Sequence, residues 1–313
     1  MTNNRLRGII AAAATPLNEG RSIDLARLIE HCRRLLANGC DGINLLGTTG
    51  EATSFSREER LAAMKAIAGS GLPRERFMVG TGAAALSDAA HLTAAARELG
   101  FAGALLLPPF YYKGIEDDSV VGYVEAVMAR TGRQGLRLYL YHFPQNSGVP
   151  YGVGAVEKLH RAHPEHVLGL KDSSGDLAYA AELTRRMPDL DVFPSAEGAL
   201  AKALEHRFAG CISATANITA PIAAEGWRGL DTKGGRAAIE AATRIRAAFA
   251  DYPLIAGVKW ALAQLYGDET WLRLCPPLRG LAASEQRGLR DKLAATVFRH
   301  WHQKRERRAG RVQ

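Results

Sequence analysis

Short apolar runs alternate along the chain with longer segments of helical periodicity. Eight of these runs are bounded by Gly, Thr or Pro and have the length of buried strands. We predict strands at 8–14, 42–46, 77–80, 103–107, 136–141, 167–171, 191–195 and 210–214. Because each run is followed by a helical pattern, this order predicts an α/β protein with a parallel sheet. Eight such units close a (β/α)8 TIM barrel.

Strand signals end after about Pro221, and only helical patterns follow. These patterns lie near 234–250, 254–265 and 284–300. We therefore expect a barrel at 1–222 and a C-terminal helical extension, with a basic tail, at 223–313. A doubly wound open sheet shares the same alternation of strands and helices. However, no G-x-G-x-x-G fingerprint follows the first strand, which favours the barrel.

Composition and charge narrow the function classes. Hydrophobic residues make up 47% of the chain and charged residues 23%, a mix that argues against a disordered or fibrous protein. Much of the formal net charge of +8 lies in the tail at 300–311. We interpret this tail as solvated and expect no nucleic-acid partner, with binding of a polyanion as the alternative.

The four cysteines show neither C-x-x-C spacing nor the spacing of a zinc site, so we expect reduced and mostly buried thiols. No apolar run approaches the roughly 18 residues that span a bilayer, and the N-terminus lacks the apolar core of a signal peptide. A cytoplasmic location without a membrane partner is the expectation.

A lysine stands at the end of the sixth predicted strand. In a barrel the C-terminal ends of the strands carry the active site, and Lys171 follows a fully apolar run. Burial disfavours the charged form of an amine, which makes it a nucleophile toward a carbonyl carbon. The alternative is a lysine that reaches solvent from a strand end.

Two other strand ends carry side chains suited to proton transfer. The second strand leads into the turn GTTGE at 47–51, whose backbone N–H groups can hold a carboxylate and whose threonine hydroxyls can pass protons. On the fifth strand, Tyr139 and Tyr141 share a face because side chains alternate along a strand. The neighbouring strand brings Tyr141 near Lys171, where a phenol can act as a general acid or base. An ordinary Gly-rich turn and a core tyrosine are the alternatives.

Two further features bear on the chemistry. An aromatic loop, PPFYYK at 108–113, follows the fourth strand over the same face, with a packed lid as its alternative interpretation. A metal-dependent aldolase would gather His and carboxylate side chains at the strand ends. The sequence offers no such cluster, so no metal is expected.

Three motifs together resemble the dihydrodipicolinate synthase and N-acetylneuraminate lyase family of class I pyruvate-dependent aldolases. They are GTTGE at 47–51, YHFP at 141–144 and GLKDSSGD at 169–176. The similarity extends from the ATP motif at 14–16 through SATAN at 213–217 to GVK at 257–259, which is nearly the whole chain. The resemblance implies a (β/α)8 barrel with a C-terminal helical extension, assembled as a homotetramer, a dimer of dimers.

The resemblance also implies roles for individual residues. Lys171 corresponds to the Schiff-base lysine, which holds pyruvate covalently as an imine without any other cofactor. Tyr141 corresponds to the proton-shuttling tyrosine, with Thr49 in the same relay. Tyr111 corresponds to a tyrosine that reaches the neighbouring subunit's site, and the adjacent Tyr112 is the alternative. The residues expected to bind the substrate are Gly47, Thr48, Thr49, Asn146, Glu197 and Ile212.

Departures from the family pattern concern the substrate. Dihydrodipicolinate synthases place an arginine two residues after the proline of the tyrosine motif, where it holds the carboxylate of aspartate semialdehyde. This chain has Asn146 there, and an amide lacks the charged fork that binds a carboxylate. The segments SGV at 147–149 and SSGDL at 173–177 are more similar to the sugar-acid lyases, in which an acidic residue near the position of Glu197 often binds substrate hydroxyls.

We therefore expect a Schiff-base lyase or aldolase that cleaves or condenses a 2-keto acid, with pyruvate as the common partner. A hydroxylated, sugar-acid-like 2-keto acid is the first expectation for the substrate. The alternative within the class is 4-hydroxy-tetrahydrodipicolinate (dihydrodipicolinate) synthase. The alternative from another class is a barrel that binds a keto acid without turnover, since a fold alone does not determine a function.

Overall fold

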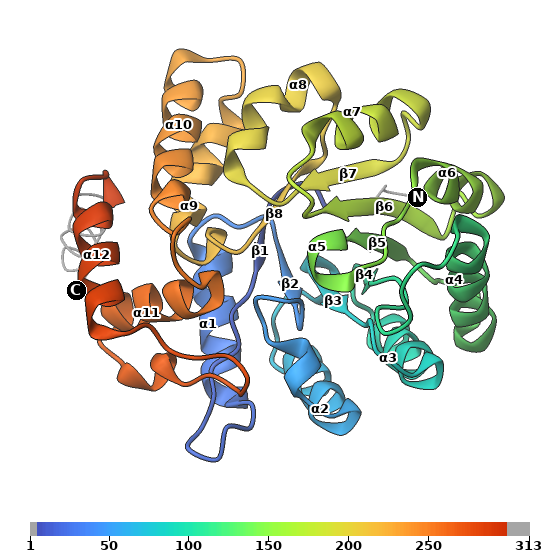
Figure 1. Ribbon diagram of the computed structural model, residues 1–313, viewed down its shortest axis with the longest axis horizontal. Helices are drawn as coiled ribbons and strands as arrows, with labels where there is room; N and C mark the ends of the chain where they lie inside the picture. Colours follow the sequence, from blue (N-terminus) through green and yellow to red (C-terminus); the bar gives the residue numbers. More distant parts are fainter. Residues whose placement is uncertain (1–4, 299–313) are drawn as a thin grey trace.

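Eight parallel strands run around the molecule in the order β7-β6-β5-β4-β3-β2-β1-β8, with helices outside them (Figure 1). The computed structural model describes residues 5–298. The strands are β1 (Gly8–Ala12), β2 (Gly42–Leu45), β3 (Phe77–Gly80), β4 (Gly103–Leu106), β5 (Leu138–His142), β6 (Val167–Asp172), β7 (Asp191–Pro194) and β8 (Gly210–Ser213). All eight predicted strands are confirmed, and each predicted end lies within two residues of the observed one.

The barrel closes where the last strands meet the first. β8 pairs with β1 in parallel register, with Ile212 opposite Ile10. Between β7 and β8 the N–H of Ala209 donates to the carbonyl of Val192 at 2.9 Å. The (β/α)8 TIM barrel is therefore confirmed, with its seam between β7 and β8.

Helices alternate with the strands as predicted. The barrel helices are α1 (Leu25–Ala37), α2 (Arg57–Ala68), α3 (Leu86–Glu98), α4 (Asp117–Thr131), α5 (Pro144–Ser147), α6 (Val153–Ala162), α7 (Leu177–Arg186), α8 (Ala203–His206) and α9 (Ala216–Arg228). Short 3-10 helices are η1 (Ala52–Ser54), η2 (Arg74–Arg76), η3 (Glu197–Lys202) and η4 (Glu269–Leu272). Ser56 and Glu59 start α2 with a capping box, in which Ser56 Oγ accepts from Glu59 N–H at 3.1 Å and Glu59 accepts from Ser56 N–H at 2.9 Å.

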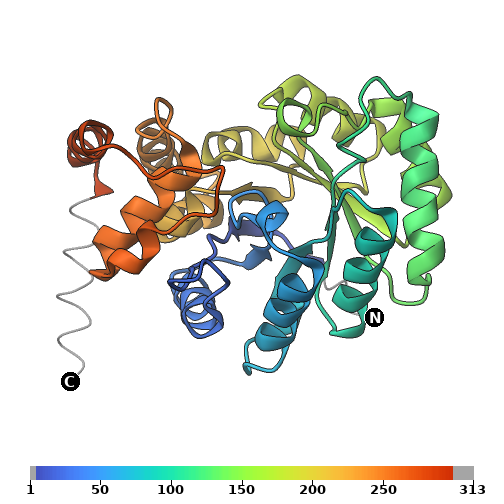
Figure 2. The same ribbon diagram turned by 60° about the horizontal axis from the view of Figure 1, so that its bottom comes forward.

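Three further helices form the C-terminal layer: α10 (Lys233–Ala247), α11 (Leu254–Tyr266) and α12 (Ala283–Ala294). Figure 2 shows this orange-to-red layer on one side of the barrel. The division expected after residue 222 falls inside α9, so barrel and layer share a continuous helix. The end of the last predicted helix and the basic tail at 300–311 lie outside the described residues. Within 5–298, no helix is long and apolar enough to cross a membrane.

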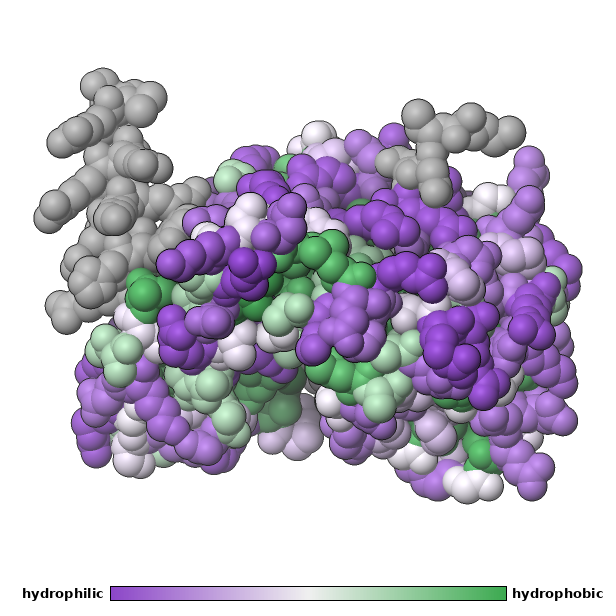
Figure 3. Space-filling model, turned by 90° about the horizontal axis from the view of Figure 1, so that it is seen from above, coloured by the Kyte–Doolittle hydropathy of each residue, from purple (hydrophilic) through white to green (hydrophobic). Residues whose placement is uncertain are grey.

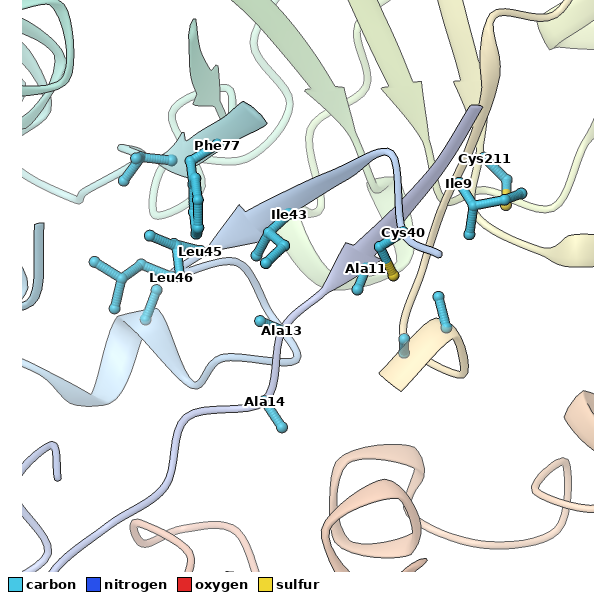
Figure 4. Packing of buried hydrophobic residues seen from close by; sticks show 14 of the residues in the cluster. Ile9, Ala11, Ala13, Ala14, Cys40, Ile43, Leu45, Leu46, Phe77 and Cys211 are labelled. Carbon is cyan, nitrogen blue, oxygen red and sulfur yellow. The ribbon is translucent and has the colours of Figure 1, made fainter. Parts of the chain in front are cut away.

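Apolar side chains form two clusters, one on each face of the strands. The outer cluster lies between strands and helices, and Figure 4 shows Ala11 of β1 near Ile43 of β2, with Ile9 of β1 beside Cys211 of β8. This alternate spacing leaves the residues between them to the barrel interior. The interior cluster includes Ile10, Met78, Tyr139, Phe193 and Ile212.

Tyr139 fills the centre of the barrel because its neighbours on both sides are glycines. A Cβ atom added to Gly103 on β4 would lie 2.8 Å from the Tyr139 ring, and one added to Gly169 on β6 would also lie 2.8 Å from it. The ring then packs edge to face with Phe193, with centroids 6.2 Å apart. The interior is thus solid below the C-terminal ends of β5 and β6, where the candidate catalytic side chains lie.

Candidate active site

Lys171 lies near the end of β6 with its side chain in a buried position. The residue is only 3% exposed, and its Nζ lies 4.3 Å from the centroid of the Tyr141 ring. β5 and β6 pair in a register that sets Tyr141 opposite Lys171, as predicted from the adjacent strands. Within residues 5–298, no carboxylate forms an ion pair with this amine. The nitrogen therefore lies over an aromatic face.

The hydroxyl of Tyr141 lies next to that of Thr48. Tyr141 Oη and Thr48 Oγ1 are 3.0 Å apart, and either can donate the proton. The expectation had given the relay to Thr49, whose side chain is 6% exposed. The structure brings the Thr48 hydroxyl, rather than that of Thr49, into hydrogen bonding with Tyr141.

The turn that carries these threonines closes on itself through its backbone. Glu51 N–H donates to Thr48 O at 3.0 Å, and Ala52 N–H donates to Gly47 O at 3.2 Å. In the described part of the chain, the N–H groups of Thr48 and Thr49 make no hydrogen bond. Adjacent N–H groups of a turn are the kind of donor that the sequence suggested for holding a carboxylate. Asn44 was missed by sequence reasoning: it is fully buried, and its Oδ1 has no partner among residues 5–298.

Ile212 and Asn146, both expected to bind substrate, occupy different surroundings. Ile212 on β8 is fully buried in the interior cluster. Asn146 is exposed on the short helix α5, directly after β5. The preceding Gln145 donates from Nε2 to Ser174 O at 2.7 Å, which joins α5 to the loop after β6. Two amide side chains, those of Gln145 and Asn146, thus lie on α5 beside the loop after β6.

Glu197 is not part of this arrangement. It begins η3 after β7 and is fully buried. Thr215 Oγ1 donates to its carboxylate oxygens at 2.8 and 2.9 Å, and Thr219 Oγ1 donates to Oε1 at 2.6 Å. Because these hydroxyls belong to the start of α9 and satisfy the carboxylate, Glu197 serves to join η3 to α9. The structure thus places the Glu197 carboxylate, expected to bind substrate hydroxyls, among the hydroxyls of Thr215 and Thr219.

The aromatic loop projects away from its own barrel. Tyr111 and Tyr112 are 75% and 73% exposed, and their rings pack edge to face with centroids 5.4 Å apart. The amine of Lys113 donates to the carbonyls of Phe110 and Ser147, which anchors the loop to α5. The structure leaves both tyrosines in contact with solvent in the single chain.

Behind Lys171 and Tyr141, a second pair of titratable residues lies on the other face of the same strands. His142 and Asp172 are register partners and are 5% and 1% exposed. Burial lowers the pKa of His142 to about 4 and raises the pKa of Asp172. His142 accepts from Tyr151 N–H at 3.0 Å and stacks on Tyr179 with centroids 4.2 Å apart. These contacts hold the ends of β5 and β6 in place.

Other surfaces are separate from the candidate site. A groove between α7 and α8 is lined by side chains that include Leu177, Arg185 and Glu205. Leu177 and, nearby, Leu204 are 38% and 64% exposed. Figure 3, which views the molecule from the side of α7, α8 and α10, shows hydrophobic residues near the middle of this face among hydrophilic ones. No group of three or more His, Cys, Asp or Glu residues within 5–298 is arranged to hold a metal ion.

The similarity of this chain to known proteins covers both the barrel and the C-terminal layer. Residues 5–296 match the model of the dihydrodipicolinate synthetase family. An uncharacterized DapA-like lyase of Chloroflexus aurantiacus is 35% identical over 209 residues, covering 66% of this chain and 69% of the relative. A 4-hydroxy-tetrahydrodipicolinate synthase of Trichlorobacter lovleyi is 32% identical over 213 residues, covering 68% and 71%. The crystal structure of dihydrodipicolinate synthase from Agrobacterium tumefaciens matches with a TM-score of 0.85 at 28% identity, covering 92% of this chain and 99% of that chain.

Proposed function

The chain belongs to the dihydrodipicolinate synthetase family and is a pyruvate-dependent lyase; on this premise we propose that Lys171 forms an imine with the ketone of a 2-keto acid. The observation that carries the proposal is the position of Lys171 Nζ, 4.3 Å from the ring centroid of Tyr141, whose hydroxyl is 3.0 Å from Thr48. An amine and a phenol on the neighbouring strands β6 and β5 thus meet an alcohol from the turn after β2, which is the set of groups that imine chemistry needs.

The reaction proceeds in the cleavage direction as follows. The neutral amine of Lys171 attacks the C2 carbonyl, and loss of water from the carbinolamine leaves a protonated imine. This cation accepts the electron pair of the C3–C4 bond when that bond breaks, while the C4 hydroxyl loses its proton and an aldehyde departs. The resulting enamine takes a proton at C3, and water hydrolyses the imine to free pyruvate and Lys171. Condensation is the same sequence in reverse.

Tyr141 moves the proton in these steps. Its hydroxyl accepts the proton of the C4 hydroxyl during cleavage and returns it during condensation. The 3.0 Å contact with Thr48 Oγ1 supports Thr48 as the next member of the relay, in place of Thr49. A hydroxyl can fill this position because it both donates and accepts.

The GTTGE turn anchors the substrate carboxylate. Within the described residues the N–H groups of Thr48 and Thr49 have no acceptor, and this supports their use for an anion. Gly47 begins the turn, where an added Cβ would lie 2.6 Å from Asn44 Oδ1, so a larger residue would have to displace the Asn44 side chain. Ile212 contributes an apolar wall below the bound ketone.

Reductive trapping tests the imine directly. Borohydride added with pyruvate should leave a reduced pyruvate adduct on Lys171, identified by mass spectrometry of the digested protein. Lys171→Arg should give no adduct, and Lys158→Arg, at an exposed lysine of α6, should give as much as the parent chain. A folded protein without the adduct would exclude the imine mechanism and favour the barrel that binds a keto acid without turnover.

We propose a hydroxylated 2-keto acid as the physiological substrate. The support is the uncharged, exposed Asn146 and its neighbour Gln145, which reaches the serine loop at 173–174. Amide and hydroxyl groups bind sugar hydroxyls, whereas the carboxylate of aspartate semialdehyde favours an arginine. Aspartate semialdehyde condensation remains the second candidate, favoured by the named relative of Trichlorobacter lovleyi.

A substrate panel distinguishes these candidates. It contains 2-keto-3-deoxy sugar acids, N-acetylneuraminate, 4-hydroxy-2-ketoglutarate, and pyruvate with aspartate semialdehyde. We expect the largest kcat/KM with a hydroxylated 2-keto acid. A larger value with aspartate semialdehyde would assign the chain to lysine-pathway synthesis instead.

We further propose a homotetramer built as a dimer of dimers, located in the cytoplasm. Support for self-association comes from the exposed tyrosines of the aromatic loop and from the exposed Leu177 and Leu204 beside the groove of α7 and α8. Four buried and free cysteines suit a reducing compartment. Light scattering of the purified protein measures the oligomeric state, and Leu204→Asp should reduce it.

A further inference from the structure

We propose that the buried ion pair between Glu51 and Lys259 positions the Thr48–Thr49 turn, which makes the C-terminal helical layer part of the active site. This inference rests on the role proposed above for that turn. Glu51 and Lys259 are positioning residues, because they act on the substrate only through the turn.

The turn has a backbone that its own sequence does not favour. Leu46 and Glu51, at its two ends, have φ angles of 50° and 56°, in the left-handed region. Residues with a Cβ atom rarely adopt this conformation, so surrounding contacts must hold it. If those contacts are removed, the N–H groups of Thr48 and Thr49 are no longer held in one position.

Glu51 is held from the C-terminal layer. Its side chain and that of Lys259 are 0% and 1% exposed, and the lysine amine donates to Glu51 Oε1. Glu51 Oε2 accepts from Cys275 N–H at 2.8 Å, and Lys259 also donates to Arg273 O at 2.7 Å. Both oxygens of the carboxylate are therefore fixed by residues of α11 and the segment after η4.

The carbonyl of Gly50 is fixed by the segment that follows β1. Thr15, which follows β1, donates from Oγ1 to Gly50 O at 2.8 Å. A Cβ atom on Gly50 would lie 3.0 Å from Ala13 O and 3.2 Å from Leu46 N, so the backbone segments are already in close contact. Gly50 and Glu51 are thus each fixed by hydrogen bonds from outside the turn. Thr48 Oγ1 meanwhile lies within hydrogen-bonding distance of Tyr141 Oη.

The ion pair is better suited to orienting the turn than to stabilising the fold. Two charges lose their hydration when they are buried, and an apolar pair of similar volume often stabilises a fold equally well. A charged pair with further hydrogen bonds instead fixes one geometry. Lys259 lies 208 residues from Glu51 and far from any strand of the barrel in sequence. Figure 2 shows the orange C-terminal segment against the blue loops that contain this turn.

The test compares two carbonyl compounds that differ in the carboxylate. Pyruvate needs the turn for binding, whereas acetone forms an imine with Lys171 but offers the turn no anion. The double variant Glu51→Gln, Lys259→Met removes both charges and leaves neither one buried alone. We expect the ratio of borohydride trapping with pyruvate to trapping with acetone to fall about tenfold or more, because a small displacement of an anchoring group has a large effect.

A control removes a buried carboxylate, paired with a largely exposed arginine, at the other end of the barrel. Asp191 begins β7, is 2% exposed and pairs with Arg7 at 2.7 Å. Asp191→Asn should lower the melting temperature without changing the pyruvate-to-acetone ratio. If the double variant does not fold, the isosteric Glu51→Gln, which keeps an acceptor for Cys275 N–H, is measured in the same way.

Two results would overturn the inference, and they are distinct. A folded variant with an unchanged ratio would reject the positioning role while leaving the imine intact. A parent chain that traps neither pyruvate nor acetone on Lys171 would reject the proposed function itself. A lowered ratio with an unchanged rate of acetone trapping supports the positioning role.

Discussion

Tyr141 and Thr48 are 93 residues apart in the chain, yet their hydroxyl oxygens lie 3.0 Å from each other. One comes from the end of β5 and the other from the turn after β2, on well-separated strands of the barrel. The contact therefore crosses the mouth of the barrel above the packed interior. It joins the group beside Lys171 to the turn proposed to bind the carboxylate.

Tyr141→Phe tests the proton transfer. The substitution keeps the ring beside Lys171 Nζ and removes only the hydroxyl, so the imine should still form, though more slowly. We expect kcat for cleavage to fall by about 10²-fold or more, the usual effect of removing a general acid or base. Steady-state kinetics and borohydride trapping measure the two steps separately. An unchanged kcat would remove Tyr141 from the relay.

The two threonines of the turn should behave differently. Thr48→Val removes the hydroxyl that contacts Tyr141 and should lower kcat about tenfold, as expected for one lost hydrogen bond. Thr49→Val should change kcat less, since only the Thr48 hydroxyl contacts Tyr141. Both variants keep their backbone N–H groups, so KM for the keto acid should change little. Equal effects on kcat would return Thr49 to the relay.

Asn146→Arg tests the basis of substrate choice. A guanidinium at this exposed position of α5 offers two parallel donors to a carboxylate. We expect kcat/KM for aspartate semialdehyde to rise relative to that for a hydroxylated 2-keto acid. The matched variant Asn146→Gln keeps an amide and should leave the ratio of the two values unchanged. If arginine does not alter the ratio, position 146 does not select the substrate.

The strands and the pairing of Tyr141 with Lys171 could be predicted because they depend on local patterns. Side chains alternate between the two faces of a strand, so their positions in the sequence predict the face of each one. Neighbouring parallel strands end at the same edge of the sheet, which brings their last residues together. The environment of Glu197 could not be predicted in this way, because its partners Thr215 and Thr219 belong to a later helix. Which of Thr48 and Thr49 contacts the Tyr141 hydroxyl depends on the backbone path of one turn, which the sequence pattern does not give.

The contact between Glu51 and Lys259 had no local signal at all. Its two residues were visible only as members of separate motifs, GTTGE and GVK. Neither motif indicates that one side chain reaches the other, since 208 residues separate them. Long-range polar contacts of this kind can be recognised only in the folded structure. Hydrophobic periodicity, in contrast, can be recognised in the sequence itself.

Acid should destabilise the fold through His31. Burial lowers its pKa from 6.5 to about 4, although a hydrogen bond with Asn217 opposes the shift. Nε2 donates to Asn217 Oδ1 at 2.8 Å, because the amide nitrogen already donates to the carbonyls of Ala12 and Ala214. The neutral ring is therefore the form that the folded chain holds.

Since the unfolded chain binds this proton more tightly, the stability from neutral His31 is full above pH 6.5 and declines toward pH 4. The complete effect is about 3 kcal/mol. Urea unfolding across this range should show a smaller decline for His31→Gln than for the parent chain, and the difference between the two isolates His31 from other titrating groups. The exposed His91→Gln should follow the parent curve. Parallel curves for all three would refute the prediction.

Tyr111 is 75% exposed in the single chain, so its side chain is accessible to a neighbouring subunit. If Tyr111 completes the site of a neighbouring subunit, Lys171→Arg and Tyr111→Phe chains should each have little activity alone. When the two are co-expressed, a mixed pair contains one site with an intact lysine and a neighbour's intact tyrosine. Random pairing of equal amounts then restores about a quarter of the parent activity.

This complementation separates the two possible locations of the tyrosine. If Tyr111 serves its own barrel, each mixed pair contains only damaged sites, and activity should stay at the level of the separate variants. Tyr112→Phe is the matched control, because it removes a hydroxyl from the adjacent ring with 73% exposure. We expect Tyr112→Phe to be active alone and to need no partner. Recovery with Tyr112→Phe instead of Tyr111→Phe would assign the shared role to Tyr112.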